Sequence, residues 1–178
     1  DDGKLTGYIT DGEGFVHNLK DHGIDIKGKK ITVAGGGGAA TAIQVQCALD
    51  GAREITIFNI KDAFFERTLA TAEKIRKAVP GIVVNVYDIA DTQKMTEEIQ
   101  SSDIFANATI VGMKPMDDQS VVKDLSAFRP GLVVCDAVYN PEETRLLKEA
   151  KEAGCICIGG KGMLLWQGVA AFKLYTGM

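Results

Sequence analysis

The apolar residues of this chain form short runs that are separated by longer stretches of helix-forming residues. Six of the runs are rich in Val, Ile and Phe, which is typical of strands buried on both faces of a sheet. A further short extended segment is expected near the N-terminus, at residues 4–8. The six strands are expected at 30–34, 54–59, 82–87, 104–107, 132–135 and 155–158.

The stretches between these runs predict helices, and several of them carry residues that begin or end a helix. Thr10 or Asp11 is expected to cap the first helix, which ends near Gly23. Pro141 suits the first position of a later helix, and Gly154 follows its last residue. The other helices are expected at 39–50, 63–78, 91–100 and 162–175, with a short one from residue 120.

Strands that alternate with helices in this way predict an α/β fold with a doubly wound, mostly parallel six-stranded sheet and three αβα layers. In such a sheet ligands bind at the carboxyl ends of the strands, near the point where the strand order reverses. Four segments rich in polar residues or glycine fall at those ends. They are residues 59–62, 107–113, 136–140 and 159–162.

The first strand runs directly into four glycines and then into an alanine-rich helix. Gly35 would make the tight turn, Gly37 would let the backbone approach a pyrophosphate, and Ala40 takes the third position of a GxGxxG/A pattern. Free N–H groups and the positive end of the helix would hold the phosphates. A flexible loop is the alternative, and methyltransferases also use glycine-rich loops, so nucleotide binding is better supported than any one cofactor.

Composition narrows the class of protein. The chain has 178 residues, the range of one domain, and its net charge of −4 gives no basic surface for nucleic acid or anionic membrane. It contains no apolar run long enough to span a bilayer, and its first residues do not form a signal peptide, so the cytoplasm is the expected location. No metal site is expected. The four cysteines are predicted to be buried reduced thiols, and they are Cys47, Cys135, Cys155 and Cys157.

Five segments in the same order along the chain resemble the shikimate dehydrogenases, most closely the quinate/shikimate dehydrogenase branch. The resemblance implies a Rossmann fold and an NAD(P)-dependent oxidoreductase. Its reaction would be the reversible oxidation of shikimate to 3-dehydroshikimate, or of quinate to 3-dehydroquinate, in aromatic amino-acid biosynthesis. The matching segments are residues 7–15, 35–40, 107–113, 138–141 and 160–168.

The resemblance also implies roles for individual residues. Asp11 corresponds to the catalytic aspartate, Gln167 and Tyr139 would contact the substrate, and Thr109, Val111 and Gly160 would lie near the nicotinamide. The cofactor-binding residues expected from the glycine loop and the resemblance together are Gly35, Gly36, Gly37, Gly38, Ala39, Ala40, Asn59, Lys61, Asp62, Asn107, Thr109, Val111 and Gly160.

The chain departs from the family pattern in two respects. Ile9 stands where the family usually has asparagine, beside the catalytic aspartate. The family's N-terminal substrate domain, which carries the lysine that pairs with this aspartate in proton transfer, has no counterpart here. We therefore expect residues 1–178 to be the NAD(P)-binding domain of a longer two-domain enzyme, with negligible turnover alone. Association of copies through an apolar patch left exposed by the missing domain is a further hypothesis.

The residues after the second strand bear on the choice of cofactor. NADP-specific relatives usually have an arginine where this chain has Ile60, and Asp62 would accept a ribose hydroxyl of NAD and repel the 2′-phosphate of NADP. Lys61 would offset part of that repulsion. NAD is therefore favoured over NADP, although Asp62 could instead cap the following helix. Two alternatives for the whole chain remain: another Rossmann dehydrogenase or reductase domain, and a non-catalytic nucleotide-binding module.

Overall fold

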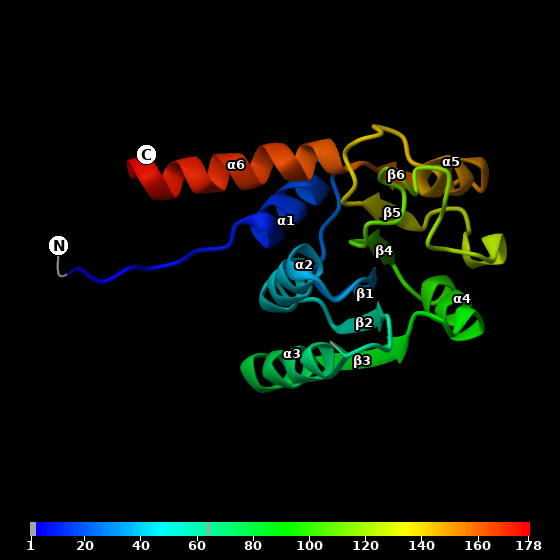
Figure 1. Cartoon of the computed structure of the whole chain (residues 1–178), viewed down its shortest axis with the longest axis horizontal. Coiled ribbons are helices and arrows are strands. Elements are labelled where there is room, and N and C mark those ends of the chain that lie inside the picture. The colour runs from blue at the N-terminus through cyan, green and yellow to red at the C-terminus, as the bar shows by residue number, and fades with distance from the viewer. Residues whose placement is uncertain (1–2, 64) are drawn as a thin grey trace.

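The computed structural model describes residues 3–63 and 65–178, and its centre is one six-stranded sheet (Figure 1). All strand pairs are parallel, and the strand order is β3-β2-β1-β4-β5-β6. The predicted doubly wound sheet is confirmed. The strands are β1 (Lys30–Ala34), β2 (Glu54–Asn59), β3 (Val83–Asp88), β4 (Ile104–Asn107), β5 (Val133–Asp136) and β6 (Ile156–Ile158).

Helices cover both faces of this sheet, so the fold has the three predicted layers. One apolar cluster joins the first face to α1, α2 and α3, and a second joins the other face to α4, η1 and α5. The helix α6 packs against α1 and projects beyond the sheet, beside the extended N-terminal segment (Figure 1). The helices are α1 (Asp11–Asp21), α2 (Gly38–Leu49), α3 (Phe65–Ala78), α4 (Thr92–Gln100), the 3-10 turn η1 (Leu125–Ala127), α5 (Arg145–Glu152) and α6 (Gly160–Thr176).

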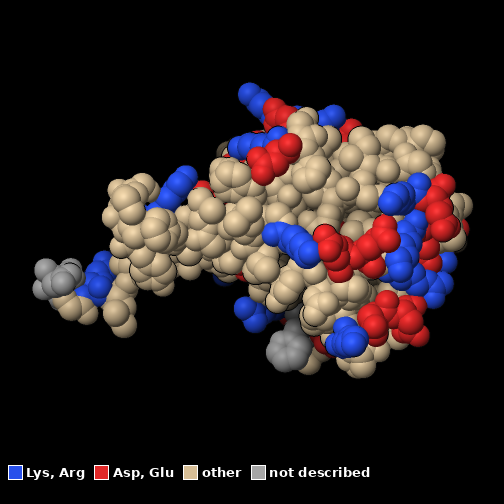
Figure 2. All heavy atoms as spheres, turned by 90° about the horizontal axis from the view of Figure 1, so that it is seen from above, with Lys and Arg blue, Asp and Glu red and all other residues tan. Residues whose placement is uncertain are grey.

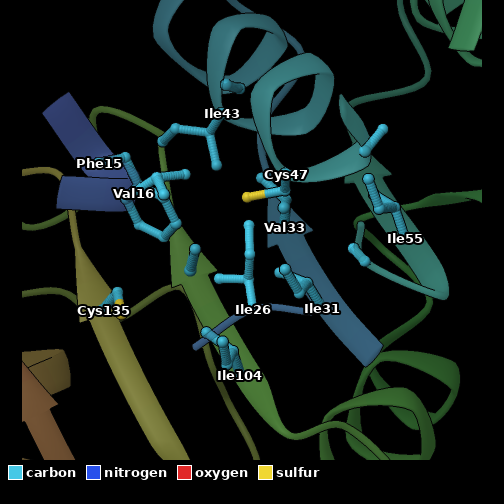
Figure 3. Close-up of a cluster of buried hydrophobic side chains, with 14 of the residues drawn as sticks. Phe15, Val16, Ile26, Ile31, Val33, Ile43, Cys47, Ile55, Ile104 and Cys135 are labelled. Atoms are coloured by element: carbon cyan, nitrogen blue, oxygen red, sulfur yellow. The ribbon is translucent and has the colours of Figure 1, made fainter. Parts of the chain in front are cut away.

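The first cluster is centred on β1, the middle of the sheet. Ile31 and Val33 of β1 lie under Ile43 and Cys47 of α2, and Phe15 of α1 closes the side of the cluster (Figure 3). None of these five side chains is more than 3% exposed. Burying an aliphatic or aromatic side chain contributes about 1.5–3 kcal/mol. The β-branched run of β1 therefore fixes α1 and α2 to the same face of the sheet.

The helix α1 meets both α2 and α6 through glycines. A Cβ at Gly12 would clash with the Ala42 carbonyl of α2, and one at Gly14 would lie 2.7 Å from the backbone N of Gln167 in α6. Larger side chains at these two positions would push the helices apart. Because of these contacts, residue 11 lies near the middle of α6, more than 150 positions later in the sequence.

Two helices predicted from sequence begin elsewhere or do not form. The helix expected from residue 141 begins at Arg145, because the backbone of Thr144 is extended and its hydroxyl accepts the N–H of Leu147. The helix expected from Ser120 is absent from residues 120–124, and a single 3-10 turn follows, capped by Asp124. Residues 121 and 122 are instead buried against the second face of the sheet.

The expectation that all four cysteines are buried is wrong for two of them. All four are free thiols, and Cys47 and Cys135 are buried, so burial raises the pKa of both thiols. Cys155 and Cys157 are only partly buried. They belong to β6 or flank it, and this strand is the edge of the sheet, where one side lacks a neighbouring strand.

A buried ion pair lies at the amino end of the sheet. Lys30 Nζ is 2.7 Å from Glu98 Oε2 and 3.1 Å from Glu54 Oε1, and it donates to Ser101 Oγ. Burial disfavours the charge on Glu98, but Lys30 and Lys94 outweigh it and hold the pKa of this carboxyl below its usual value. Ionised Glu98 thus stabilises the fold above about pH 4.3, its unfolded pKa, and the contribution is lost as the pH falls.

Lys30→Met should lower the free energy of unfolding at pH 7 by about 3 kcal/mol, because it leaves buried carboxylates without their central cation. The gap between variant and parent should narrow toward pH 3, because the stability contributed by ionised Glu98 is progressively lost as the pH falls. Urea unfolding, monitored by circular dichroism at pH 7 and at pH 3, measures this difference in the free energy of unfolding. An equal gap at pH 3 and pH 7 would contradict this account of the cluster.

Candidate functional site

Two clefts meet at the carboxyl edge of the sheet, between β1 and β4. The first has a volume of about 530 Å³ and the second about 420 Å³, and both are lined by Gly37, Ala108, Thr109 and Ile110. The chain passes from β1 to β2 on one side, while β4 lies on the other, so this is the point where the strand order reverses. An elongated ligand that fills both clefts would cross over Gly37.

The four glycines divide into two pairs with different tasks. Gly35 has a φ of 122°, and a Cβ there would lie 2.7 Å from the Ala108 carbonyl. A Cβ on Gly36 would lie 2.5 Å from Asn59 Nδ2. By contrast, a Cβ on Gly37 or Gly38 would have no protein atom within 4 Å. The first pair lets backbone segments approach one another, and the second pair presents open backbone to the clefts.

The start of α2 supplies donors at this open surface. Gly37 caps the helix with an extended backbone and no side-chain hydrogen bond, so the first N–H groups have no capping side chain. Ala39 lines the second cleft. Ala40 is fully buried, and its Cβ would be 3.2 Å from a Cβ on Gly35, which requires small residues at both places. The geometry suits an anionic group held by backbone N–H.

Beyond β2, the predicted residues lie at the outer end of the first cleft. Asn59 Nδ2 donates to Thr68 Oγ1 at 2.9 Å, and both Asn59 and Ile60 line the cleft. Lys61 and Asp62 follow immediately and are exposed, but neither is among the residues that line it. The N–H of Phe65 donates to the Asp62 carbonyl at the start of α3.

The loop after β4 separates the two clefts. Thr109 lines both, Val111 lines the first, and Asn107 lies behind the loop, 1% exposed. Asn107 Oδ1 accepts from the N–H and the hydroxyl of Thr109, at 3.1 and 2.7 Å, and its Nδ2 donates to the Val111 carbonyl at 3.0 Å. Asn107 therefore shapes the loop from within and does not itself face a cleft.

Asp136 is a residue that sequence reasoning did not select. It lies at the end of β5, beside Asn107, whose Nδ2 donates to its Oδ1 at 3.0 Å. The N–H of Val138 donates to the same oxygen and the hydroxyl of Thr144 to Oδ2. Burial raises the pKa of Asp136 to about 6, although these hydrogen bonds oppose the rise. Its only signal in the sequence is its place at a strand end.

The remaining predicted residues lie on α1, on α6 and in the loop after β5. Thr10 Oγ1 donates to Gln167 Oε1 at 3.4 Å, which connects the segment before Asp11 to α6. Asp11 is half-buried at the first position of α1, and Thr10 is the cap residue. Tyr139 lines the second cleft and is 49% exposed.

Gly160 differs from these residues because packing explains it. A Cβ there would lie 2.5 Å from the Ala137 carbonyl, and Gly160 lines neither of the two clefts. A larger cavity, of about 670 Å³, lies between α1, α6 and the segment before α5. It is lined by none of the sequence-predicted site residues.

Charged side chains do not mark the face seen in Figure 2 as a binding surface. Lys and Arg are mixed with Asp and Glu over the rounded part of the molecule, and the projecting end is mostly uncharged (Figure 2). Among the described residues no three His, Cys, Asp or Glu side chains are grouped closely enough to hold a metal. In the same part of the chain, no helix has the length and apolar character needed to cross a membrane.

Comparison with known proteins gives similarity over the whole chain. A quinate/shikimate dehydrogenase of Escherichia coli O139:H28 is 49% identical over 177 residues, 99% of this chain and 61% of that protein. Shikimate 5-dehydrogenase of Listeria monocytogenes, solved with shikimate and NAD, is 49% identical with a TM-score of 0.95, covering 100% of this chain and 61% of that one. No protein-family model matches the chain.

A second solved shikimate dehydrogenase, in complex with NADP⁺, is 35% identical with a TM-score of 0.82, and the match covers 100% of this chain and 59% of that one. These findings confirm the resemblance to the shikimate dehydrogenases, and they confirm the Rossmann fold. The chain spans about three fifths of the length of the relatives it matches.

The carboxyl of Asp136 should titrate with a midpoint near pH 6, well above ordinary aspartates at about 3.9. Because its pKa is raised in the folded chain, the ionised form costs stability, and this group should add stability as the pH falls from 7 through 6. Carbon-13 NMR of the side-chain carboxyls between pH 4 and 8 measures the midpoint. Titration at or below pH 4 would show that burial does not dominate.

Proposed function

We propose that this chain is the nicotinamide-binding part of a shikimate or quinate dehydrogenase, and that its two clefts hold the two halves of NAD or NADP. The observation that carries the proposal is the open backbone of Gly37 and Gly38 where the clefts meet. A pyrophosphate there would receive N–H groups from the start of α2. The identity of 49% to a quinate/shikimate dehydrogenase favours this ligand over other nucleotides.

The lining of each cleft suggests which half of the cofactor it takes. Asn59 and Ile60, at the end of β2, line the first cleft, which supports the adenosine half there. Tyr139 lines the second cleft, which supports the nicotinamide half there, with Thr109 at the boundary of both clefts. Val111, which the resemblance puts near the nicotinamide, lines the first cleft, so we assign it to the boundary between the two halves.

The bound nicotinamide would exchange a hydride with the carbon that carries a ring hydroxyl of shikimate or quinate. The chain's own contribution begins with Asp11, which would orient the group that takes the hydroxyl proton and adjust its pKa. Gln167 would hold the substrate. The hydrogen bond from Thr10 to Gln167 supports these roles, because it ties the aspartate segment to the glutamine of α6.

We propose that the apolar end of the molecule meets the rest of a longer two-domain protein. The N-terminal segment and the end of α6 project together, with Leu5 98% and Tyr175 91% exposed. Large exposed apolar side chains at one end of a molecule support an interface there. Association between copies of the chain through the same surface is the alternative occupant.

Calorimetric titration of the chain with NAD and with NADP, at the same salt concentration, tests the cofactor assignment. A carboxylate that accepts a ribose hydroxyl contributes about 1.5–3 kcal/mol, and one about 4 Å from a 2′-phosphate opposes binding by roughly 1–4 kcal/mol. The parent chain should therefore bind NAD more tightly than NADP. Asp62→Ala should lower the affinity for NAD by about tenfold and raise the affinity for NADP.

Asp25→Ala is the matched control for this titration, since Asp25 is an exposed aspartate in the loop before β1 and accepts the N–H of the nearby Lys27. It should leave both affinities unchanged. Tighter binding of NADP by the parent chain would reverse the preference and show that Lys61 outweighs Asp62. Absence of binding to either dinucleotide would contradict the proposed function.

Gly37→Ala should weaken NAD binding by at least about tenfold, because the new methyl group occupies the place where the pyrophosphate approaches the backbone. It should leave the melting temperature nearly unchanged, since no protein atom lies within 4 Å of that methyl group. Gly168→Ala on α6, where the surroundings are equally open, is the control and should leave NAD affinity intact. Unchanged affinity in Gly37→Ala would place the pyrophosphate elsewhere.

A further inference from the structure

The buried carboxylate of Asp136 has no part in the binding scheme above, yet it lies directly behind the loop that separates the clefts. We propose that Asp136 is a positioning residue for the cofactor site: it fixes the side-chain amide of Asn107, and through Asn107 it sets the shape of residues 108–112. This inference rests on the proposed function, because that loop is where the two halves of the dinucleotide would meet.

The first step of the argument is the pairing of neighbouring strands. Asn107 and Asp136 are register partners at the last positions of β4 and β5, which brings their side chains together. Asn107 Nδ2 donates to Asp136 Oδ1 at 3.0 Å and to the Val111 carbonyl at 3.0 Å. Both amide hydrogens of Asn107 are thus used, one on the carboxylate and one on the loop.

The carboxylate of Asp136 fixes the orientation of the Asn107 side-chain amide. In the observed orientation, Oδ1 of Asn107 accepts from the N–H and the hydroxyl of Thr109. Turning the amide over would place that oxygen against Oδ1 of Asp136, acceptor against acceptor, and would place Nδ2 against the N–H of Thr109. Only the observed orientation satisfies every group, and in it the Thr109 hydroxyl also accepts the N–H of Val111 at 3.1 Å.

Contacts on the other side keep the carboxylate itself from turning. The N–H of Val138 donates to Oδ1 at 3.0 Å, and the hydroxyl of Thr144 donates to Oδ2 at 2.6 Å. Thr144 is also the cap residue of α5, so the carboxylate is anchored to a helix end. Gly112, with a φ of 100°, closes the loop, and a Cβ there would lie 3.4 Å from the methyl carbon of Thr144.

Two substitutions separate positioning from general stability. Asp136→Ala removes the oxygen that accepts a hydrogen bond from Asn107. Asp136→Asn can keep an oxygen in that place, facing Asn107 and Val138. Its NH2 group would then face Thr144, whose hydroxyl can accept a hydrogen bond from it. Because the ionised form of Asp136 costs stability, Asp136→Asn is not expected to unfold the chain. Asp103→Ala is the matched control, because Asp103 directly precedes β4, at the opposite end of that strand from Asn107, and accepts the N–H of Lys30 far from the clefts.

The experiment has two readouts: amide hydrogen exchange of Thr109 and Val111 by NMR in the chain without ligand, and the dissociation constant of NAD by calorimetry. Asp136→Ala should speed hydrogen exchange at both amides by about tenfold and raise the dissociation constant of NAD by about tenfold. Asp136→Asn should restore most of the exchange protection and most of the NAD affinity. Asp103→Ala should lower the melting temperature and change neither readout.

Unchanged exchange at Thr109 and Val111 in Asp136→Ala would overturn the inference, and so would faster exchange with full NAD affinity. If Asp136→Asn restores neither the exchange protection nor the NAD affinity that Asp136→Ala loses, the inference is also overturned, because the effect would then not depend on the orientation of the Asn107 amide. If the parent chain binds no NAD, the proposed function fails, and the exchange readout still shows whether Asp136 fixes the loop.

Discussion

The site depends on the close approach of two backbone segments, at the point where β1 and β4 end. Gly35 turns with a left-handed backbone against the carbonyl of Ala108, and a side chain at that position would force the two loops apart. Because the loops touch, the clefts on either side share one wall, formed by Ala108, Thr109 and Ile110. The start of α2 faces the opening, so the same contact that closes the sheet edge also aims backbone N–H groups at a ligand.

A second close approach connects this edge to the segment that carries Asp11. Gly12 and Gly14 let α1 lie in backbone contact with α2 on one side and α6 on the other. As a result Thr10 reaches Gln167, 157 residues later, with a direct hydrogen bond. The segment that carries Asp11 is therefore packed against α2, which begins at the glycine loop, and against α6, which carries Gln167.

The sequence predicts the parts of this structure that depend on local pattern. The β-branched runs predict the strands, and the four glycines after β1 predict a turn at Gly35 and open backbone at Gly37, both of which the structure has. The sequence does not predict the close approach of Gly36 to Asn59. Prediction fails where a tertiary contact overrides local preference. The hydroxyl of Thr144 donates to Asp136 and accepts the N–H of Leu147, so α5 begins at Arg145 instead of residue 141.

The network of Asn107 and Asp136 could not be predicted at all, because it depends on strand register. Two polar residues at two strand ends carry no sign that they will be neighbours until β4 and β5 pair. The half-buried Cys155 and Cys157 are a similar case, since their exposure follows from the place of β6 at the sheet edge. Pattern thus indicates which residues lie at the ligand-binding edge, and topology decides which of them face a ligand and which support it.

The most direct test of the account is a crystal structure of the chain grown with NAD. It should show the pyrophosphate over Gly37 and Gly38 with N–H groups of α2 as donors, the adenosine beside Asn59 and Ile60, and the nicotinamide between Thr109 and Tyr139. Density for the dinucleotide in the cavity between α1 and α6, or with its pyrophosphate away from the glycines, would contradict the central claim.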